Sequence, residues 1–179
     1  MNATLAPLES DLDLKLDAAR FRRAMGQFAT GVTVITFGHE GRTAGMTANA
    51  FMSLSVDPPM ILVSVRAQAR FAQSIAHGDA FGVSFLSQNQ EALSRHFGGQ
   101  PREALDDPLE RMGGVPVVRA ALVQIAARVD AVHGGGDHLI YTARVEALRE
   151  SAGPPLLFHG GKYRQIVAHD PQHCWCDCE

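Results

Sequence analysis

The chain has 179 residues, of which 46% are hydrophobic and 20% charged, and this is enough apolar material for the core of one compact domain. Its formal net charge of −3 excludes the strongly basic balance that nucleic-acid-binding proteins usually carry. The arginines are scattered rather than clustered, so the sequence gives no sign of a basic surface for anionic membranes. We therefore expect neither nucleic acid nor a membrane among its partners.

The two ends of the chain differ in composition from the rest. Residues 1–16 are predicted to form a flexible acidic arm, without the basic and apolar regions of a signal peptide. The folded domain is predicted over 17–168, where no stretch approaches the ~20 apolar residues of a membrane span. All three cysteines lie in the predicted tail at 169–179, where none can crosslink the fold. This pattern suits a reducing cytoplasm, which is the expected location.

The hydrophobic pattern predicts several strands and a few short helices. The first helix is expected to begin at Asp17, a typical N-cap residue, because Phe21, Met25 and Phe28 then share one face. A loop is expected at 100–114 and a glycine turn at 134–136. In chain order, the pattern predicts a helix over 17–28, strands over 32–37, 43–56 and 60–65, a helix over 71–78, a strand over 80–86, a helix over 87–99, and strands over 120–132, 138–148 and 156–167.

The expected strand at 43–56 has an unusual composition. Its last third alternates apolar and polar residues, as a half-buried strand does. Its first half is small and polar, with Gly45, Thr47 and Asn49 among alanines. The sequence Asp57-Pro58-Pro59 ends the strand, since proline cannot donate a hydrogen bond to a sheet.

About seven strands with hairpin-length connections predict a mainly β fold of antiparallel strands, either a barrel or a sandwich. The chain lacks both βαβ alternation and a GxGxxG sequence after a strand, which argues against a Rossmann dinucleotide-binding unit. It also lacks the GxSxG, HExxH and GxxxxGK[ST] signatures.

One dense cluster of metal-ligating residue types is present, HCWCDC at 173–178. Its one histidine and three cysteines would match the ligand count of a tetrahedral zinc site. Their alternate spacing on a short tail differs from the usual CxxC knuckle. A loose tail exposed to oxidation is therefore preferred to a zinc site, and no metal is predicted.

Polar residues gather in four further places: Thr43–Asn49, Ser64–Arg66 with Arg70, Gly136–His138, and Phe158–Tyr163. Arginines near the start of a helix suit a phosphate group, and paired glycines let a ligand approach the backbone. Each group taken alone is more typical of solvent-facing residues on strands and turns than of a binding site. Only their joint arrangement favours a binding site.

Four blocks of sequence occur in a recognisable order: FRRAMGQFATGVTVITF, GMTANAFMSLSVDPPMILVSV, GGGDHLIYTARVEAL and PLLFHGGKYRQI. From about Phe21 to Ile166 they resemble the flavin reductase family, the small NAD(P)H:flavin oxidoreductases that serve two-component flavin monooxygenases. The resemblance implies an FMN-binding split barrel that forms a homodimer and binds FMN or FAD at the dimer interface. The choices between FMN and FAD, and between NADH and NADPH, stay open.

The resemblance also implies roles for particular residues. It places one set around the flavin ring: Thr43, Ala44, Gly45, Met46, Thr47, Asn49 and Ala50. It places a second set at the flavin phosphate: Ser64, Val65, Arg66, Arg70 and Phe71. His96 and Phe97 would add a contact on the adenine side of FAD. The nicotinamide dinucleotide would contact Phe158, His159, Gly160 and Gly161.

The resemblance makes His138 and Asp137 the catalytic candidates. His138 would donate a hydrogen bond to the nicotinamide carboxamide or to the flavin edge. Adjacent residues on a regular strand point to opposite faces, so Asp137 can pair with His138 only if the turn is irregular. His138 is therefore preferred over Asp137.

The implied function is NAD(P)H-dependent reduction of FMN or FAD, which supplies reduced flavin to a separate monooxygenase. Since the flavin carries the redox chemistry, no protein nucleophile is needed. Two alternatives stay open. The first is a reductase that retains its flavin and reduces a corrinoid or ferric iron, and the second is a flavin carrier without turnover.

Overall fold

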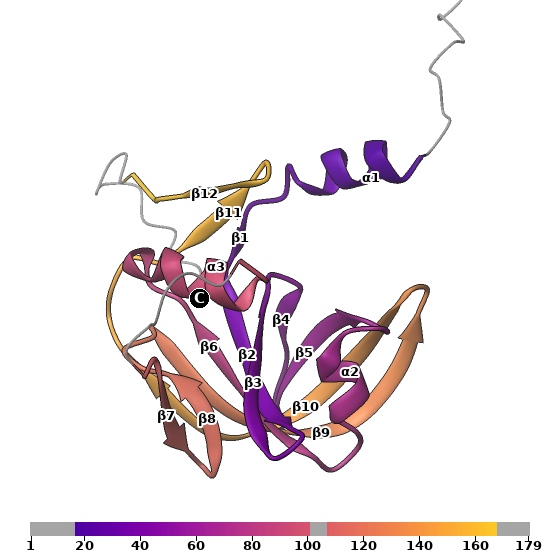
Figure 1. The fold of residues 1–179 in the computed structure, drawn as a ribbon, viewed down its shortest axis with the longest axis vertical. Coiled ribbons are helices and arrows are strands. Elements are labelled where there is room, and N and C mark those ends of the chain that lie inside the picture. The colour runs from indigo at the N-terminus through magenta and orange to yellow at the C-terminus, as the bar shows by residue number, and fades with distance from the viewer. Residues whose placement is uncertain (1–16, 101–106, 168–179) are drawn as a thin grey trace, which may run out of the picture.

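A computed structural model describes residues 17–100 and 107–167. Its main element is a seven-stranded antiparallel sheet in the order β3-β2-β6-β9-β10-β5-β4 (Figure 1). The strands are β2 (Thr33–His39), β3 (Arg42–Ala48), β4 (Phe51–Val56), β5 (Pro59–Arg66), β6 (Ala80–Phe85), β9 (Val123–Gly135) and β10 (His138–Glu150). The prediction of a mainly β, antiparallel fold is confirmed.

The two edge strands of this sheet follow one another directly in the chain. β3 and β4 stand at opposite ends of the strand order, yet only Asn49 and Ala50 separate them. A link of two residues can join the two edges only if the sheet curls round on itself. The Ser64 N–H donates to the Ala50 carbonyl at 3.0 Å and extends the β4–β5 pairing to this link. The single strand expected over 43–56 is therefore wrong, because the chain changes edges at Asn49.

The barrel interior is filled by a continuous core. Phe71, fully buried, comes from the short helix α2 (Arg70–Ser74). Its ring makes edge-to-face contacts with Phe37, Phe81 and Tyr141 at centroid distances of 5.2, 5.3 and 5.0 Å. Burying such a ring stabilises the fold by about 1.5–3 kcal/mol, and each aromatic pair adds to this.

The helix α2 ends at Ser74, four residues before the expected end.

The helices start where the sequence predicts. The Asp17 side chain accepts a hydrogen bond of 2.6 Å from the Arg20 N–H and caps α1 (Ala18–Met25), which ends three residues before Phe28. Ser87 forms a reciprocal capping box with Gln90 at the 3₁₀ turn η1 (Gln88–Gln90), which leads into α3 (Glu91–Phe97). No helix in 17–100 or 107–167 is long and apolar enough to cross a membrane.

A small sheet lies beside the barrel and consists of β1 (Thr30–Gly31), β11 (Leu157–His159) and β12 (Lys162–Arg164). Gly160 and Gly161, with φ of 58° and 77°, form the turn between β11 and β12. The single strand expected over 156–167 is therefore wrong. The two glycines reverse the chain, which needs the left-handed conformation that glycine adopts without strain.

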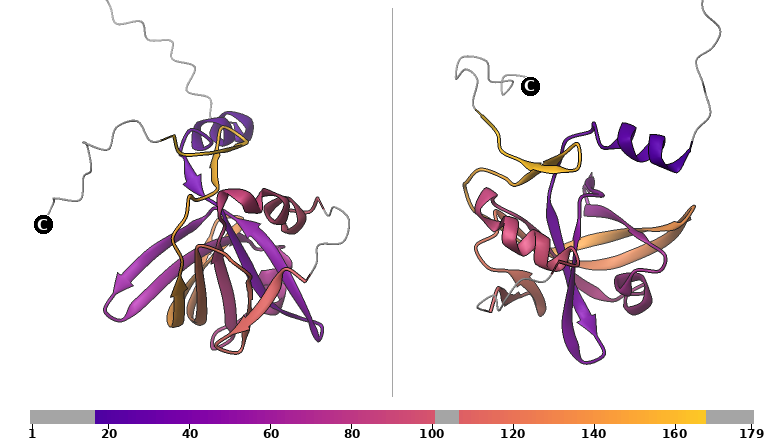
Figure 2. Two further views of the ribbon diagram at one scale, coloured as in Figure 1. Left: turned by 90° about the vertical axis from the view of Figure 1, so that its left-hand side faces the viewer. Right: turned by 45° about the horizontal axis from the view of Figure 1, so that its top comes forward.

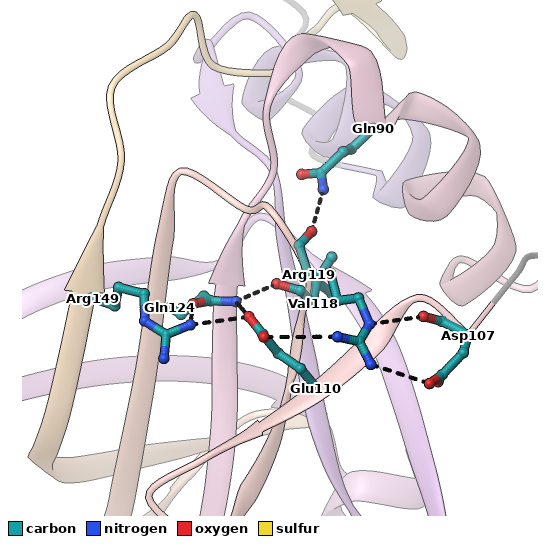
Figure 3. Close-up of polar contacts among 7 residues, drawn as sticks. All are labelled: Gln90, Asp107, Glu110, Val118, Arg119, Gln124 and Arg149. Carbon is teal, nitrogen blue, oxygen red and sulfur yellow. Dashed lines mark hydrogen bonds and ion pairs between the residues drawn. The ribbon is translucent and has the colours of Figure 1, made fainter.

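A second hairpin was missed in the sequence. The loop expected at 100–114 contains β7 (Leu109–Met112), which turns through Gly113 and Gly114 into β8 (Val115–Val118). A glycine pair between two apolar runs is a hairpin signal. The expectation of a loop at 100–114 was therefore wrong for this hairpin, although the signal was present in the sequence. Polar contacts attach this hairpin to the main sheet (Figure 3): the buried Gln124 side chain donates to Glu110 Oε1 at 2.6 Å and to the Val118 carbonyl at 2.7 Å.

The close approach of β8 to the barrel depends on Gly82 in β6. A Cβ atom at Gly82 would lie 2.0 Å from the Pro116 carbonyl oxygen and 2.6 Å from Thr36 Oγ1. Thr36 Oγ1 itself donates a hydrogen bond to the same carbonyl. A side chain at position 82 would therefore force two backbone segments apart.

We predict that Gly82→Ala lowers the free energy of unfolding by about 1–3 kcal/mol, the usual cost of overpacking a core. Gly38→Ala is the matched control, because Gly38 also lies in a strand of this sheet and a Cβ there meets nothing within 4 Å. Urea unfolding followed by circular dichroism would measure both. Equal midpoints for the two variants would show that the contact at Gly82 does not constrain the fold.

Candidate active site

The small residues of β3 face two different environments. Ala44, Met46 and Ala48 pack against the barrel core. On the other face lies α3: the Thr47 hydroxyl donates to the Ser94 carbonyl at 2.6 Å, and a Cβ at Gly45 would lie 2.6 Å from the Phe97 ring. The small size of Gly45 is thus required by a contact within the chain, which the sequence did not reveal. The role of these residues at a flavin stays a prediction.

The second and third predicted groups lie next to each other. In the pairing of β5 with β10, Arg66 is opposite His138 and Ser64 is opposite Ile140. The Ala67 N–H donates to the Asp137 carbonyl at 3.0 Å, and the Ser64 N–H donates to Ala50. The structure thus joins Ala50, the end of β5 and the start of β10 into one continuous region. These parts are far apart in the sequence.

Asp137 and His138 form a direct pair. His138 Nδ1 lies 2.7 Å from Asp137 Oδ1. The turn before them is irregular, with Gly136 at φ 68°, so that the two adjacent side chains can meet. The hydrogen bond and the charge of His138 lower the pKa of Asp137, and the charge of Arg66 adds to this. With Nδ1 held by the carboxylate, Nε2 is left for a ligand.

The fourth predicted group lies against α3. The Phe158 and Tyr163 rings are in edge contact at 5.4 Å, and the Tyr163 hydroxyl lies 2.8 Å from the buried Ser94 Oγ. A cavity of about 640 Å³ opens here, of the size that small ligands occupy. Its lining includes predicted flavin and nicotinamide residues, Lys162 and Tyr163 of the fourth predicted group, and three residues that were not predicted, Ser94, Arg95 and Arg164. The predicted flavin and nicotinamide residues among them are Thr47, Asn49, Phe158 and Gly161.

A second cavity of about 950 Å³ adjoins the first, and the two share Val32 and Asn49. Its walls are mostly apolar, and they include Ala50, Ser64 and Leu156. The flavin ring has apolar faces and polar edges, and the Asn49 amide can both donate to such an edge and accept from it. The residues at the junction of the two cavities therefore fit a flavin.

Two buried side-chain polar atoms in the described part of the chain have no hydrogen-bond partner there, His96 Nδ1 and Thr30 Oγ1. His96 belongs to the predicted adenine contact, and Thr30 lines the apolar cavity. An unpaired buried polar atom is costly, so a polar ligand group at either atom would stabilise the protein.

Some predicted residues are not brought together. The β9–β10 turn that carries Asp137 and the β11–β12 hairpin lie on opposite sides of the chain (Figures 1 and 2). Val65 and Phe71 are core residues with 2% and 0% exposure, so they could contact a ligand only through backbone atoms. Thr43 pairs with Gly38 near the opposite end of β3 from Asn49.

Other predictions fall outside the described residues. These are the flexible arm at 1–16 and the cysteine tail at 169–179. Within 17–100 and 107–167, no group of three or more histidine, cysteine, aspartate or glutamate side chains could hold a metal ion.

The sequence and the arrangement of the strands are those of a known family. Residues 25–167 match the family described as Flavin reductase like domain. The match spans most of the chain, and the chain therefore belongs to the flavin reductase family. The resemblance stated from the sequence blocks is confirmed, and with it the split-barrel fold.

Curated relatives and solved structures agree with this assignment. The chain is 39% identical over 159 residues to an NADH-dependent flavin reductase of a Rhodococcus species, covering 87% of this chain and 90% of that protein. It is 39% identical over 150 residues to the reductase component of 4-hydroxyphenylacetate 3-monooxygenase from Thermus thermophilus, covering 82% and 95%. The structure of flavin reductase PheA2 in its native state superposes with a TM-score of 0.78 at 42% identity, covering 86% of this chain and 100% of that chain.

Proposed function

We propose that this chain transfers a hydride from NADH to FMN or FAD, and that the reduced flavin leaves for a separate monooxygenase component. The observation that carries the proposal is the meeting of a polar and an apolar cavity at Asn49, next to Ser64 and Ala50. The names of its relatives, NADH-dependent flavin reductases and reductase components of monooxygenases, support this reading. They favour NADH over NADPH as the donor.

When bound, the flavin supplies the two-electron acceptor, so the protein has only to bind, orient and stabilise charge. A bound flavin would accept the hydride that NADH gives up, and the edge of its ring would then carry more negative charge. A hydrogen-bond donor at that edge stabilises the developing charge. We assign this role to His138 Nε2, with the Asp137 carboxylate holding the ring through Nδ1. Arg66 and Arg70, both exposed, are assigned to the flavin phosphate.

We also propose that two copies of the chain form the active unit, with the flavin at their interface. Helix α1 stands apart from the barrel and has no buried residue (Figure 1). Its apolar side chains are exposed: Phe21 by 50%, Met25 by 56%, and Phe28 beyond its end by 77%. Apolar surface of this extent is costly in water unless a partner covers it.

A second copy would also explain the separation of the catalytic groups. The β9–β10 turn with His138 and the β11–β12 hairpin with Phe158 lie on opposite sides of one chain, and in a dimer they could meet from different subunits. We propose the cytoplasm as the location of the protein, because the distribution of its cysteines suits a reducing compartment.

Anaerobic and aerobic NADH oxidation tests the proposed function. We expect the rate to rise with added FMN or FAD and to saturate, because free flavin is a substrate. A protein that keeps one flavin through dialysis and gains no rate from free flavin would instead be the reductase of another acceptor. Binding of flavin without any NADH oxidation would indicate a carrier.

We predict that His138→Asn slows hydride transfer about ten- to a thousandfold, the range for one positioned donor, while oxidised flavin still binds. Anaerobic stopped-flow reduction of flavin by NADH measures this step directly. His133→Asn is the matched control, since His133 is exposed on the neighbouring strand and pairs with Ile140. If both variants reduce flavin at the wild-type rate, His138 has only a structural role.

A further inference from the structure

Three basic side chains line the polar cavity of about 640 Å³: Arg95 from α3, and Lys162 and Arg164 from β12. None of the three was among the residues predicted to contact NAD(P)H. Lys162 and Arg164 are two apart on a strand, so both lie on the same face of β12. Within the described part of the chain, neither of them forms an ion pair.

Arg95 is held in place by its neighbours. Its Nε and Nη2 atoms both donate to Glu91 Oε1, at 2.8 and 2.6 Å. The guanidinium carbon lies 4.8 Å from the centre of the Tyr163 ring, the geometry of a cation–π contact. Nη1 has no partner among the described residues and is left for a ligand. A guanidinium fixed in this way loses little conformational entropy when it binds an anion.

The charge of the cavity is unbalanced. Glu91, its acidic lining residue, is already paired with Arg95, so Lys162 and Arg164 leave an excess of positive charge. The same cavity contains Phe158 and Gly161, which were predicted to contact the nicotinamide dinucleotide, and it reaches Asn49 at the predicted flavin ring. A ligand in this cavity would therefore meet aromatic and amide groups together with three cations.

We propose that Arg95, Lys162 and Arg164 form the subsite for the pyrophosphate of the nicotinamide dinucleotide. This inference rests on the proposed function, because it takes NADH as the hydride donor. Pyrophosphate carries two negative charges, and arginine and lysine are the side chains that bind phosphate groups best. The subsite would fix the dinucleotide without contacting the reacting atoms, so its contribution is to binding and not to hydride transfer.

The test compares two hydride donors that differ in phosphate. NADH carries the pyrophosphate, whereas dihydronicotinamide riboside carries the same reducing ring and no phosphate. We expect Lys162→Gln and Arg164→Gln each to raise the KM for NADH about three- to tenfold, the effect of one partly exposed charged contact. The KM for dihydronicotinamide riboside and the saturated rate should not change. The rise of the NADH KM with salt should also be weaker in the variants.

Arg111→Gln is the matched control, because it removes one exposed positive charge from β7 and lines neither cavity. An unchanged NADH KM in both Lys162→Gln and Arg164→Gln overturns the proposal. So does an equal rise for both donors, which would indicate a distorted site. A raised KM for FMN with an unchanged KM for riboflavin would assign the three cations to the flavin phosphate instead.

Failure of the proposed function is a separate outcome. In that case the wild-type chain would oxidise no NADH with either FMN or FAD. Calorimetric binding of NAD⁺ to the wild-type chain and to the Lys162→Gln, Arg164→Gln double variant still tests the subsite. Weaker binding to the double variant supports the subsite, and equal binding overturns it.

Discussion

The structure depends on the two-residue link that joins the edges of the main sheet. β3 and β4 are neighbours in the chain and opposite edges in the strand order, so Asn49 and Ala50 force the sheet to close into a barrel. The closure is not completed by pairing of β3 with β4, and a split remains there. Backbone groups at a sheet edge are available to other partners, which makes this edge suited to hold a ligand.

The same link decides where the candidate site lies. The Ser64 N–H of β5 donates a hydrogen bond to the carbonyl of Ala50 in the link. β5 also pairs with β10, and this pairing places His138 opposite Arg66. On the other side, Thr47 and Gly45 fix α3 against β3, and Ser94 of α3 contacts Tyr163 of the β11–β12 hairpin. Short contacts thus connect β3, β5, β10, α3 and the β11–β12 hairpin, which are far apart in the sequence, to the region around the link at Asn49 and Ala50.

The choice among the three readings of the function follows from the chemistry of these residues. A carrier needs a flavin pocket alone, and the apolar cavity beside Asn49 would be sufficient for it. The held imidazole of His138 and the basic cavity under the β11–β12 hairpin have no purpose in a carrier. They suit an enzyme that stabilises charge at the flavin edge and binds an anionic hydride donor.

Sequence patterns by themselves determined the strand-rich class, the caps of the first helix and of η1, and the resemblance to flavin reductases. These features depend on local periodicity, on capping residues such as Asp17 and Ser87, and on the order of sequence blocks. The β7–β8 hairpin was also readable from Gly113 and Gly114, although it was not predicted.

Tertiary structure alone decided how these elements meet. The sequence could not show that Phe97 covers Gly45, that His138 is opposite Arg66, or that Arg95 and Lys162 share a cavity. Each of these contacts joins residues that are distant in the chain. Strand order and register, which local patterns do not encode, set these contacts, because the side-chain period specifies only which face of a strand is buried.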